Sequence, residues 1–242
     1  HFLSIKALAA EDDDFLRLFI PWLPFETSRG ALTLPEYLKL GDPSHPEIRF
    51  SSDLNLYRQA AQLATGRLPI IRAVYTYDAA LLMRYAALFA GVRLTQLTPS
   101  DLVREFSALS ARELRETATL REVARGALLP LDADARVSRF EPADIPALAF
   151  AGLGRDLRRT REKLGGDAGG LWADLLGDLE GETAGSATEV HFNLAHPLIL
   201  RAAQLPDGPL LRRILGMLYV QALLLGQHPL TARELNLLNN GL

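Results

Sequence analysis

Two histidines near the C-terminal end, His191 and His196, are the first candidates for chemistry in this sequence. A zinc-binding H-E-x-x-H helix needs its two histidines one turn apart on the same helical face. Here His191 falls in an apolar run typical of a strand, and His196 falls in a turn directly before Pro197. We therefore interpret both as turn or capping residues, with Asn193 as the expected side-chain cap of the helix that begins at Pro197.

Serine nucleophiles have no supporting motif. The G-x-S-x-G turn that exposes a nucleophile does not occur, and we expect no base near Ser28, Ser138 or Ser186. The sequence therefore predicts no catalytic serine.

Acidic residues cluster in the run Glu11–Asp14, just before the apolar run Phe15–Ile20. Carboxylates at a helix start cap the helix and complement its dipole, and this is our interpretation. A hard-metal site is the alternative, but adjacent aspartates on a helix fan outward and do not converge on one ion. The pair Asp132 and Asp134 is likewise interpreted as a solvated turn rather than a general acid–base couple.

Phosphate-binding glycine loops are missing, since neither G-x-x-x-x-G-K-[ST] nor a complete G-x-G-x-x-G occurs. Gly152-Leu153-Gly154 lacks the third glycine. The segment 165–186 is rich in glycine and acid, and we interpret it as a flexible loop with one helical island around Trp172. We expect no catalytic, cofactor-binding or metal-binding residue in this chain.

Composition is that of an ordinary soluble globular protein. The 242 residues suggest two domains, and a net charge of -3 argues against binding to nucleic acid. The absence of cysteine excludes disulfides and fits a reducing cytoplasm. No apolar run is long enough to span a bilayer, and no signal peptide opens the chain. The chain begins with His1 rather than methionine, and we interpret it as part of a larger protein.

The first part of the chain alternates strands and helices with short connections. We expect strands over 48–50, 68–77 and 92–97 and helices over 51–65, 78–90 and 99–106. This order predicts a parallel-rich sheet covered by helices, a small layered α/β subdomain that occupies residues 1–108. The polar residues that follow the strands, Asp78, Ser100 and Asp101, are interpreted as helix caps.

The second part, residues 109–242, is predicted to be an α+β domain. We expect a charged helix over 112–127, a strand over 135–140, a turn into a helix over 141–148, a basic helix over 155–163 and a strand over 189–194. A long helix over 209–225 and a short helix over 231–242 complete it.

The last two helices carry apolar residues at the spacing of a helix that packs on a partner. A second copy of the same pair would cover them in a two-fold dimer, ending in a four-helix bundle. Packing of the stripe on its own domain is the alternative. The predicted interface residues are Leu211, Ile214, Leu215, Leu218, Ala222, Leu225, Leu235 and Leu238.

The sequence resembles the 90-kDa heat-shock chaperone family, and in particular its short bacterial branch. The C-terminal match comprises Asn193, His196-Pro197-Leu198, the run Leu218-Tyr219-Val220-Gln221-Ala222-Leu223-Leu224 and Asn236-Leu237-Leu238. Leu194 replaces a proline of the family pattern. Earlier matches are Leu23–Gly30, Leu32–Tyr37, Val137–Phe140 and Ile145–Leu148, so the resemblance covers the later middle domain and the C-terminal dimerisation domain.

The resemblance implies a homodimeric, ATP-dependent clamp that assists protein folding under stress in the cytoplasm. In that family ATP and magnesium bind an N-terminal domain, which has no counterpart here, so this chain is not expected to hydrolyse ATP. The region after Asp144 contacts unfolded clients in the family, and apolar groups beside the basic run 155–163 suit weak, promiscuous binding. The candidate client-contact residues are Ile145, Leu148, Phe150, Leu153 and Trp172.

Other interpretations stay open at this stage. The candidate client residues could pack into their own domain, and the basic run could contact RNA or an anionic membrane. The chain could also be a stand-alone α/β enzyme or ligand-binding module, with a cleft at the carboxyl ends of the strands. A pure oligomerisation module without a client surface is the third possibility.

Overall fold

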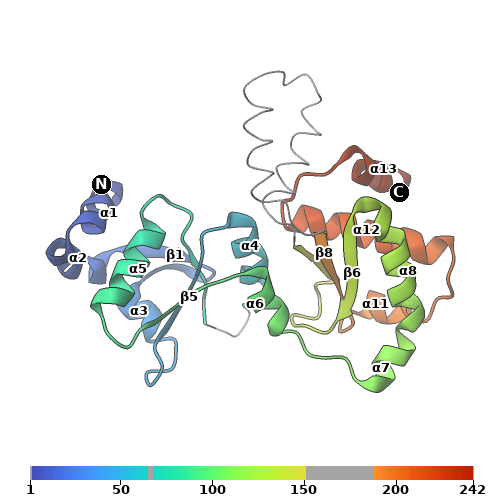
Figure 1. The fold of residues 1–242 in the computed structure, drawn as a ribbon, viewed down its shortest axis with the longest axis horizontal. Helices are drawn as coiled ribbons and strands as arrows, with labels where there is room; N and C mark the ends of the chain where they lie inside the picture. The colour runs from blue at the N-terminus through green and yellow to red at the C-terminus, as the bar shows by residue number, and fades with distance from the viewer. Residues whose placement is uncertain (1, 65–67, 151–187, 242) are drawn as a thin grey trace, which may run out of the picture. The chain divides into compact units, whose positions relative to one another are not determined.

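The computed structural model describes residues 2–64, 68–150 and 188–241 (Figure 1). The chain divides into two compact units, His1–Val103 and Arg104–Leu242, whereas the sequence analysis puts the division between 108 and 109. Both units mix helices and sheet, which is consistent with the α+β class. Within the described residues, no helix is long and apolar enough to cross a membrane.

The first unit is built on a five-stranded sheet of order β2-β1-β4-β3-β5. Its strands are β1 (Pro24–Thr27), β2 (Gly30–Thr33), β3 (Glu47–Ser51), β4 (Ile71–Arg72) and β5 (Arg93–Gln96). Strand β3 runs parallel to β4 and β5, as the alternating pattern predicts, and the hairpin β1–β2 adds an antiparallel edge. The sequence analysis did not predict that hairpin, which turns at Gly30 with a φ of 97°.

The helices of this unit are α1 (Phe2–Glu11), α2 (Asp13–Phe19), α3 (Leu34–Leu38), α4 (Leu54–Leu63) and α5 (Asp78–Leu88), and α6 (Pro99–Arg104) leads to the division; η1 (Ile20–Trp22) is a single 3-10 turn. The predicted acidic cap occurs at Asp12, which accepts from Phe15 N. Helix α4 is capped by Asp53, which accepts from Asn55 N and Leu56 N. The strand predicted over 68–77 was wrong in length, because Pro69 has no N–H to pair and only Ile71–Arg72 joins the sheet.

The second unit has a three-stranded sheet of order β6-β8-β7, formed by β6 (Ala133–Ser138), β7 (Ala147–Phe150) and β8 (Thr188–Asn193). Strands β6 and β8 are parallel, and β7 is antiparallel to β8. The prediction of a helix over 141–148 was wrong. Pro142 and Pro146 remove the N–H groups a helix needs, and the apolar run Ala147–Phe150 forms the strand instead.

Its helices are α7 (Ala111–Glu116), α8 (Ala118–Leu128), α11 (Pro197–Ala202), α12 (Pro209–Leu225) and α13 (Ala232–Gly241), with the 3-10 turn η2 (Leu129–Leu131) before β6. The helix predicted over 112–127 is divided at Thr117, whose buried hydroxyl donates to Glu113 O at 2.7 Å. Helices α8 and α12 pack on one face of the sheet, and the core lies between them and the inward side chains of the strands.

Candidate functional site

Helix α12 buries most of the stripe that was predicted to form a dimer interface. Leu211, Leu215, Leu218 and Ala222 are at most 5% exposed and belong to the core of their own unit. These four residues pack against the sheet and α8, so their assignment to a dimer interface was wrong for the structure described. The reason is that α12 is apolar on nearly all sides, and its spacing fits more than one stripe.

The other four predicted interface residues reach the surface to different degrees. Leu225 is 39% exposed and Leu235 is 41% exposed, whereas Ile214 and Leu238 are half-buried against the core. The predicted set therefore contains two different groups of residues, one inside the unit and one at its surface.

A second apolar stripe of α12 lies at least partly at the surface of the unit, and we call it the outer face of α12. Its positions recur every three or four residues, so they lie along one side of the helix. Leu210 is 61% exposed and Leu224 is 49% exposed. The outer face comprises Leu210, Ile214, Met217, Gln221, Leu224 and Leu225, with Arg213 at its edge.

Helix α13 is fixed to α12 by a close approach and a buried polar pair. A Cβ at Gly216 would meet the Leu237 side chain at 3.7 Å, an ordinary van der Waals distance, so Gly216 lies directly against Leu237. The hydroxyl of Tyr219 donates to Oε1 of Glu234 at 2.5 Å, and both residues are almost fully buried. The other oxygen of Glu234 accepts from Thr231 N at 2.8 Å at the start of the helix.

The predicted client-contact residues do not form an exposed patch among the described residues. Leu148 and Phe150 lie in β7 at 2% and 6% exposure, and Ile145 is half-buried before that strand. The assignment of Leu148 and Phe150 was therefore wrong, because a strand buried on both faces leaves neither side chain available. Leu153 and Trp172 lie outside the described residues.

Three polar side chains form a hydrogen-bonded chain on the face of the sheet turned away from α8 and α12. Oγ of Ser138 lies 2.8 Å from Nδ1 of His191, and Nε2 of His191 lies 3.0 Å from Oε1 of Glu189. Glu189 also pairs with Arg136 at 3.1 Å. The interpretation that Ser138 has no base nearby was wrong, because parallel pairing of β6 with β8 brings the base from a distant part of the chain.

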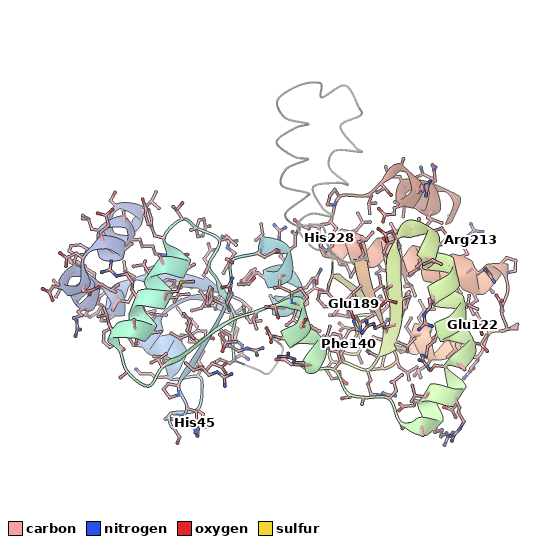
Figure 2. The ribbon with its side chains drawn as sticks, viewed as in Figure 1. His45, Glu122, Phe140, Glu189, Arg213 and His228 are labelled. Carbon is pink, nitrogen blue, oxygen red and sulfur yellow. The ribbon has the colours of Figure 1, made fainter. Side chains whose placement is uncertain are left out.

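This order of groups matches the serine, base and acid of nucleophilic enzymes. The imidazole of His191 is 2% exposed, and the rings of Phe106 and Phe150 lie edge-on to it with centroids 5.2 Å and 6.0 Å away. Burial lowers the pKa of His191, and the Glu189 carboxylate opposes that shift in part. A neutral, enclosed ring of this kind links the strands of the sheet (Glu189 is labelled in Figure 2).

In the turn between β8 and α11, the polar residues have other roles than the sequence predicts. His196, not Asn193, caps α11, with its Nδ1 accepting from Leu198 N at 3.1 Å. Asn193 is fully buried and instead joins two segments: Oδ1 accepts from Phe140 N and Ala195 N, and Nδ2 donates to Phe140 O and Ile145 O.

The remaining carboxylate candidates interact with neighbouring groups of the chain. Asp101 lies inside α6 and accepts from Thr98 N at 2.9 Å, and the Thr98 hydroxyl accepts from Asp101 N, so Thr98 rather than Asp101 takes the capping position. Asp78 pairs with Lys6 at 2.7 Å rather than capping α5. Asp134 pairs with Arg136. Over the described ranges, no group of three or more histidine, aspartate or glutamate side chains is arranged to hold a metal ion.

A hollow of about 770 Å³ lies between α7 and α11. Its charged groups are paired with one another, Arg139 with Glu113 at 2.5 Å and Arg112 with Glu116 at 2.7 Å. Hydrogen bonds from Ser110, and then the Arg139 guanidinium, lower the pKa of Glu113 to about 2. The arrangement is a satisfied surface network over an apolar floor that includes Leu194 and Leu200.

Comparison with known proteins gives no assignment: no protein-family model matches the sequence, and no curated protein matches it significantly.

Proposed function

We propose that this chain forms a homodimer through the outer face of α12 together with α13. The observation that supports this most is the exposure of Leu210, Leu224 and Leu225 along one side of a helix that carries no acidic residue. Solvent-exposed leucines in a row are costly unless another surface covers them. A second copy offers an identical face, and a two-fold axis lets one patch cover the other.

The dimer needs α13 as well as α12. Stable interfaces bury roughly 800 Å² on each partner, which is more than one face of a single helix offers. Leu235 and Leu238 lie on α13, which packs directly on α12, and they extend the apolar surface. The proposed interface therefore retains Ile214, Leu225, Leu235 and Leu238 of the residues predicted from the sequence, and adds Leu210, Met217 and Leu224.

We infer further that the dimer is part of a chaperone of the 90-kDa heat-shock type. The support is the resemblance in the C-terminal sequence and the order of elements, in which a strand, a short helix that begins at Pro197, a long helix and a second short helix follow one another. In this proposal the chain holds two protomers together and contacts unfolded proteins, and an ATP-binding domain elsewhere in the parent protein opens and closes the clamp.

Solution mass tests the interface. We expect the chain to be dimeric in light scattering and the double variant Leu210→Glu/Leu224→Glu to be monomeric, because each partner then places carboxylates in an apolar contact. The matched control is Leu18→Glu/Leu200→Glu, whose leucines are 66% and 44% exposed on other helices. A monomeric unmodified chain, or a double variant that stays dimeric while folded, contradicts the proposal.

Crosslinking tests the chaperone role. A photoreactive residue at Ile145, Leu153 or Trp172 should capture a chemically unfolded protein in preference to the same protein in its native state. The control position is Leu18, which is exposed and belongs to no proposed surface. A dimer that captures nothing above the control supports a pure oligomerisation module instead.

A stand-alone enzymatic module is the second candidate, favoured by the Ser138–His191–Glu189 chain of hydrogen bonds. A fluorophosphonate that labels reactive serines tests it. Labelling of the unmodified chain that disappears in Ser138→Ala, with native circular dichroism retained, would support an esterase-like activity. Labelling equal to that of the heat-unfolded chain would exclude a reactive Ser138.

A further inference from the structure

Helix α8 and the start of α12 border a groove that shares Met217 with the proposed dimer surface and reaches Leu237 of α13. Two hollows meet at Gly126, where an added Cβ would have no heavy atom within 4 Å. One runs along α8 and has a volume of about 550 Å³, and the other opens towards α12 with about 460 Å³. We call the two together the α8–α12 groove.

The floor of the groove is apolar. Leu128, Met217 and Leu237 line it from three different helices. At its end, Leu129 is 71% exposed, more than any other large apolar side chain of this unit that the structure describes. A groove of this kind offers contact to aliphatic side chains of a partner.

The rim of the groove is basic. Arg121, Arg125 and Arg213 border it, and none of the three makes a side-chain hydrogen bond or ion pair within the part of the chain that the structure describes. Figure 2 labels Arg213 on α12 and Glu122, the one carboxylate of the lining, on α8.

Four arginines elsewhere in the same unit are paired with carboxylates. Arg112, Arg136, Arg139 and Arg212 each contact a carboxylate of the chain at 3.2 Å or less. The three rim arginines outnumber Glu122, so the rim carries a net positive charge although the net charge of the chain is -3. Fixed charges around an apolar floor select a partner of opposite charge more than they add affinity.

We propose that the α8–α12 groove binds an acidic amphipathic segment of another protein. Aliphatic side chains of that segment contact Leu129, Met217 and Leu237, and its carboxylates face Arg121, Arg125 and Arg213. Guanidinium groups suit this task because they bind carboxylates through two parallel hydrogen bonds. Helical segments with one apolar face dock in grooves of this form.

The variants that test the groove lie outside the proposed dimer surface, although the groove shares Met217 with that surface. Arg121 and Arg125 lie on α8, and neither belongs to the outer face of α12 or to α13. A variant at these two residues therefore leaves the proposed dimer contact unchanged, and peptide binding and solution mass can fail independently.

The test uses fluorescence anisotropy with synthetic peptides and the full 242-residue chain. The probe is a short amphipathic peptide of leucine and glutamate, compared with the same peptide carrying glutamine or lysine in place of glutamate. We expect the acidic peptide to bind best, and its affinity to fall with added salt because rim charges are screened.

Charge reversal locates the site. Arg121→Glu/Arg125→Glu should weaken binding of the acidic peptide by about tenfold or more, since two attractive contacts become repulsive. The control is Arg115→Glu, which like Arg125 changes an exposed arginine in the last turn of a helix, but outside the groove. This control should bind as the unmodified chain does.

Three results would overturn the proposal. The acidic and lysine peptides could bind equally, the double variant could bind as tightly as the Arg115→Glu control, or the double variant could change the solution mass. The last result would show that the groove is a contact between copies of this chain. Circular dichroism of each variant separates loss of binding from loss of fold.

Discussion

Oγ of Ser138 lies 2.8 Å from Nδ1 of His191, although 53 positions separate the two residues in the sequence. The contact exists because β6 and β8 are parallel neighbours, so that Arg136 pairs with His191 and Ser138 with Asn193. A carboxylate such as Glu189 only accepts hydrogen bonds at neutral pH. The neutral His191 ring therefore donates a hydrogen bond from Nε2 to Glu189, and its Nδ1 accepts a hydrogen bond from the Ser138 hydroxyl.

This arrangement predicts a pH-dependent loss of stability. Burial lowers the pKa of His191 in the folded chain below its ordinary value of 6.5, with Glu189 opposing in part. As the pH falls, the unfolded chain takes up the proton first, so folding is penalised. The neutral His191 ring therefore makes its full contribution to the free energy of unfolding above pH 6.5. This contribution is lost as the pH falls from there through the pKa of His191 in the folded chain.

Urea denaturation over a pH series measures this effect. The free energy of unfolding should fall more steeply below about pH 6.5 in the unmodified chain than in His191→Gln, which cannot titrate there. The comparison uses the slope of the free energy of unfolding against pH. A loss of stability that is the same at every pH therefore does not affect it. Parallel slopes would contradict the prediction.

Asn193 should be the most sensitive residue of the turn that follows β8. It is fully buried, and its amide group bonds both Phe140 and Ile145 in a distant segment. Asn193→Ala removes these bonds and leaves buried backbone groups unsatisfied, at a cost of about 2–4 kcal/mol. Asn239→Ala, at an exposed position of α13, should change stability by less than about 0.5 kcal/mol in the same denaturation assay.

The buried pair of Tyr219 and Glu234 should hold α13 on α12. Tyr219→Phe removes the phenol that donates to Glu234 at 2.5 Å and leaves a buried carboxylate oxygen short of one donor, which costs about 1–3 kcal/mol. Hydrogen exchange should accelerate in α13 more than in α12, because α12 is also packed on the sheet and α8. Equal acceleration in both helices would mean that the pair stabilises the whole unit rather than the contact between the helices.

Local sequence signals predicted the positions of most elements in the second unit. Helix α12 has the bounds expected from Pro209 at its start and Gly226 after its end. The parallel core of the first sheet likewise follows from alternating strands and helices. Pro142 and Pro146 are a sequence signal against a helix in that segment, because neither has an N–H to donate.

The arrangement of side chains in space was harder to predict. Periodicity alone does not choose between two apolar stripes of α12, because the choice depends on which side meets the sheet and α8. The bond between Ser138 and His191 depends on the register of two strands far apart in the sequence. The rim of the α8–α12 groove also comes from separate helices, and only the fold brings Arg125 and Arg213 to one groove.

The first unit provides a test of a buried ion pair. Asp78 is 1% exposed, its Oδ1 accepts from Nζ of Lys6 at 2.7 Å, and its Oδ2 has no hydrogen-bond partner. Lys6 also lies over the ring of Phe25, 4.5 Å from its centroid. Lys6→Met keeps the length of the side chain but leaves Asp78 as an uncompensated buried charge, which costs about 3–5 kcal/mol.

Neutralising Asp78 should recover part of this loss. In Lys6→Met/Asp78→Asn no buried charge is left without a partner, so the double variant should be more stable than Lys6→Met alone in urea denaturation. The double variant could instead be no more stable than Lys6→Met. The loss of stability in Lys6→Met would then come from the lost packing of the Lys6 side chain on Phe25 and not from the charge of Asp78. The cycle of single and double variants therefore distinguishes the ion pair of Lys6 with Asp78 in α5 from the cation–π contact of Lys6 with Phe25 in β1.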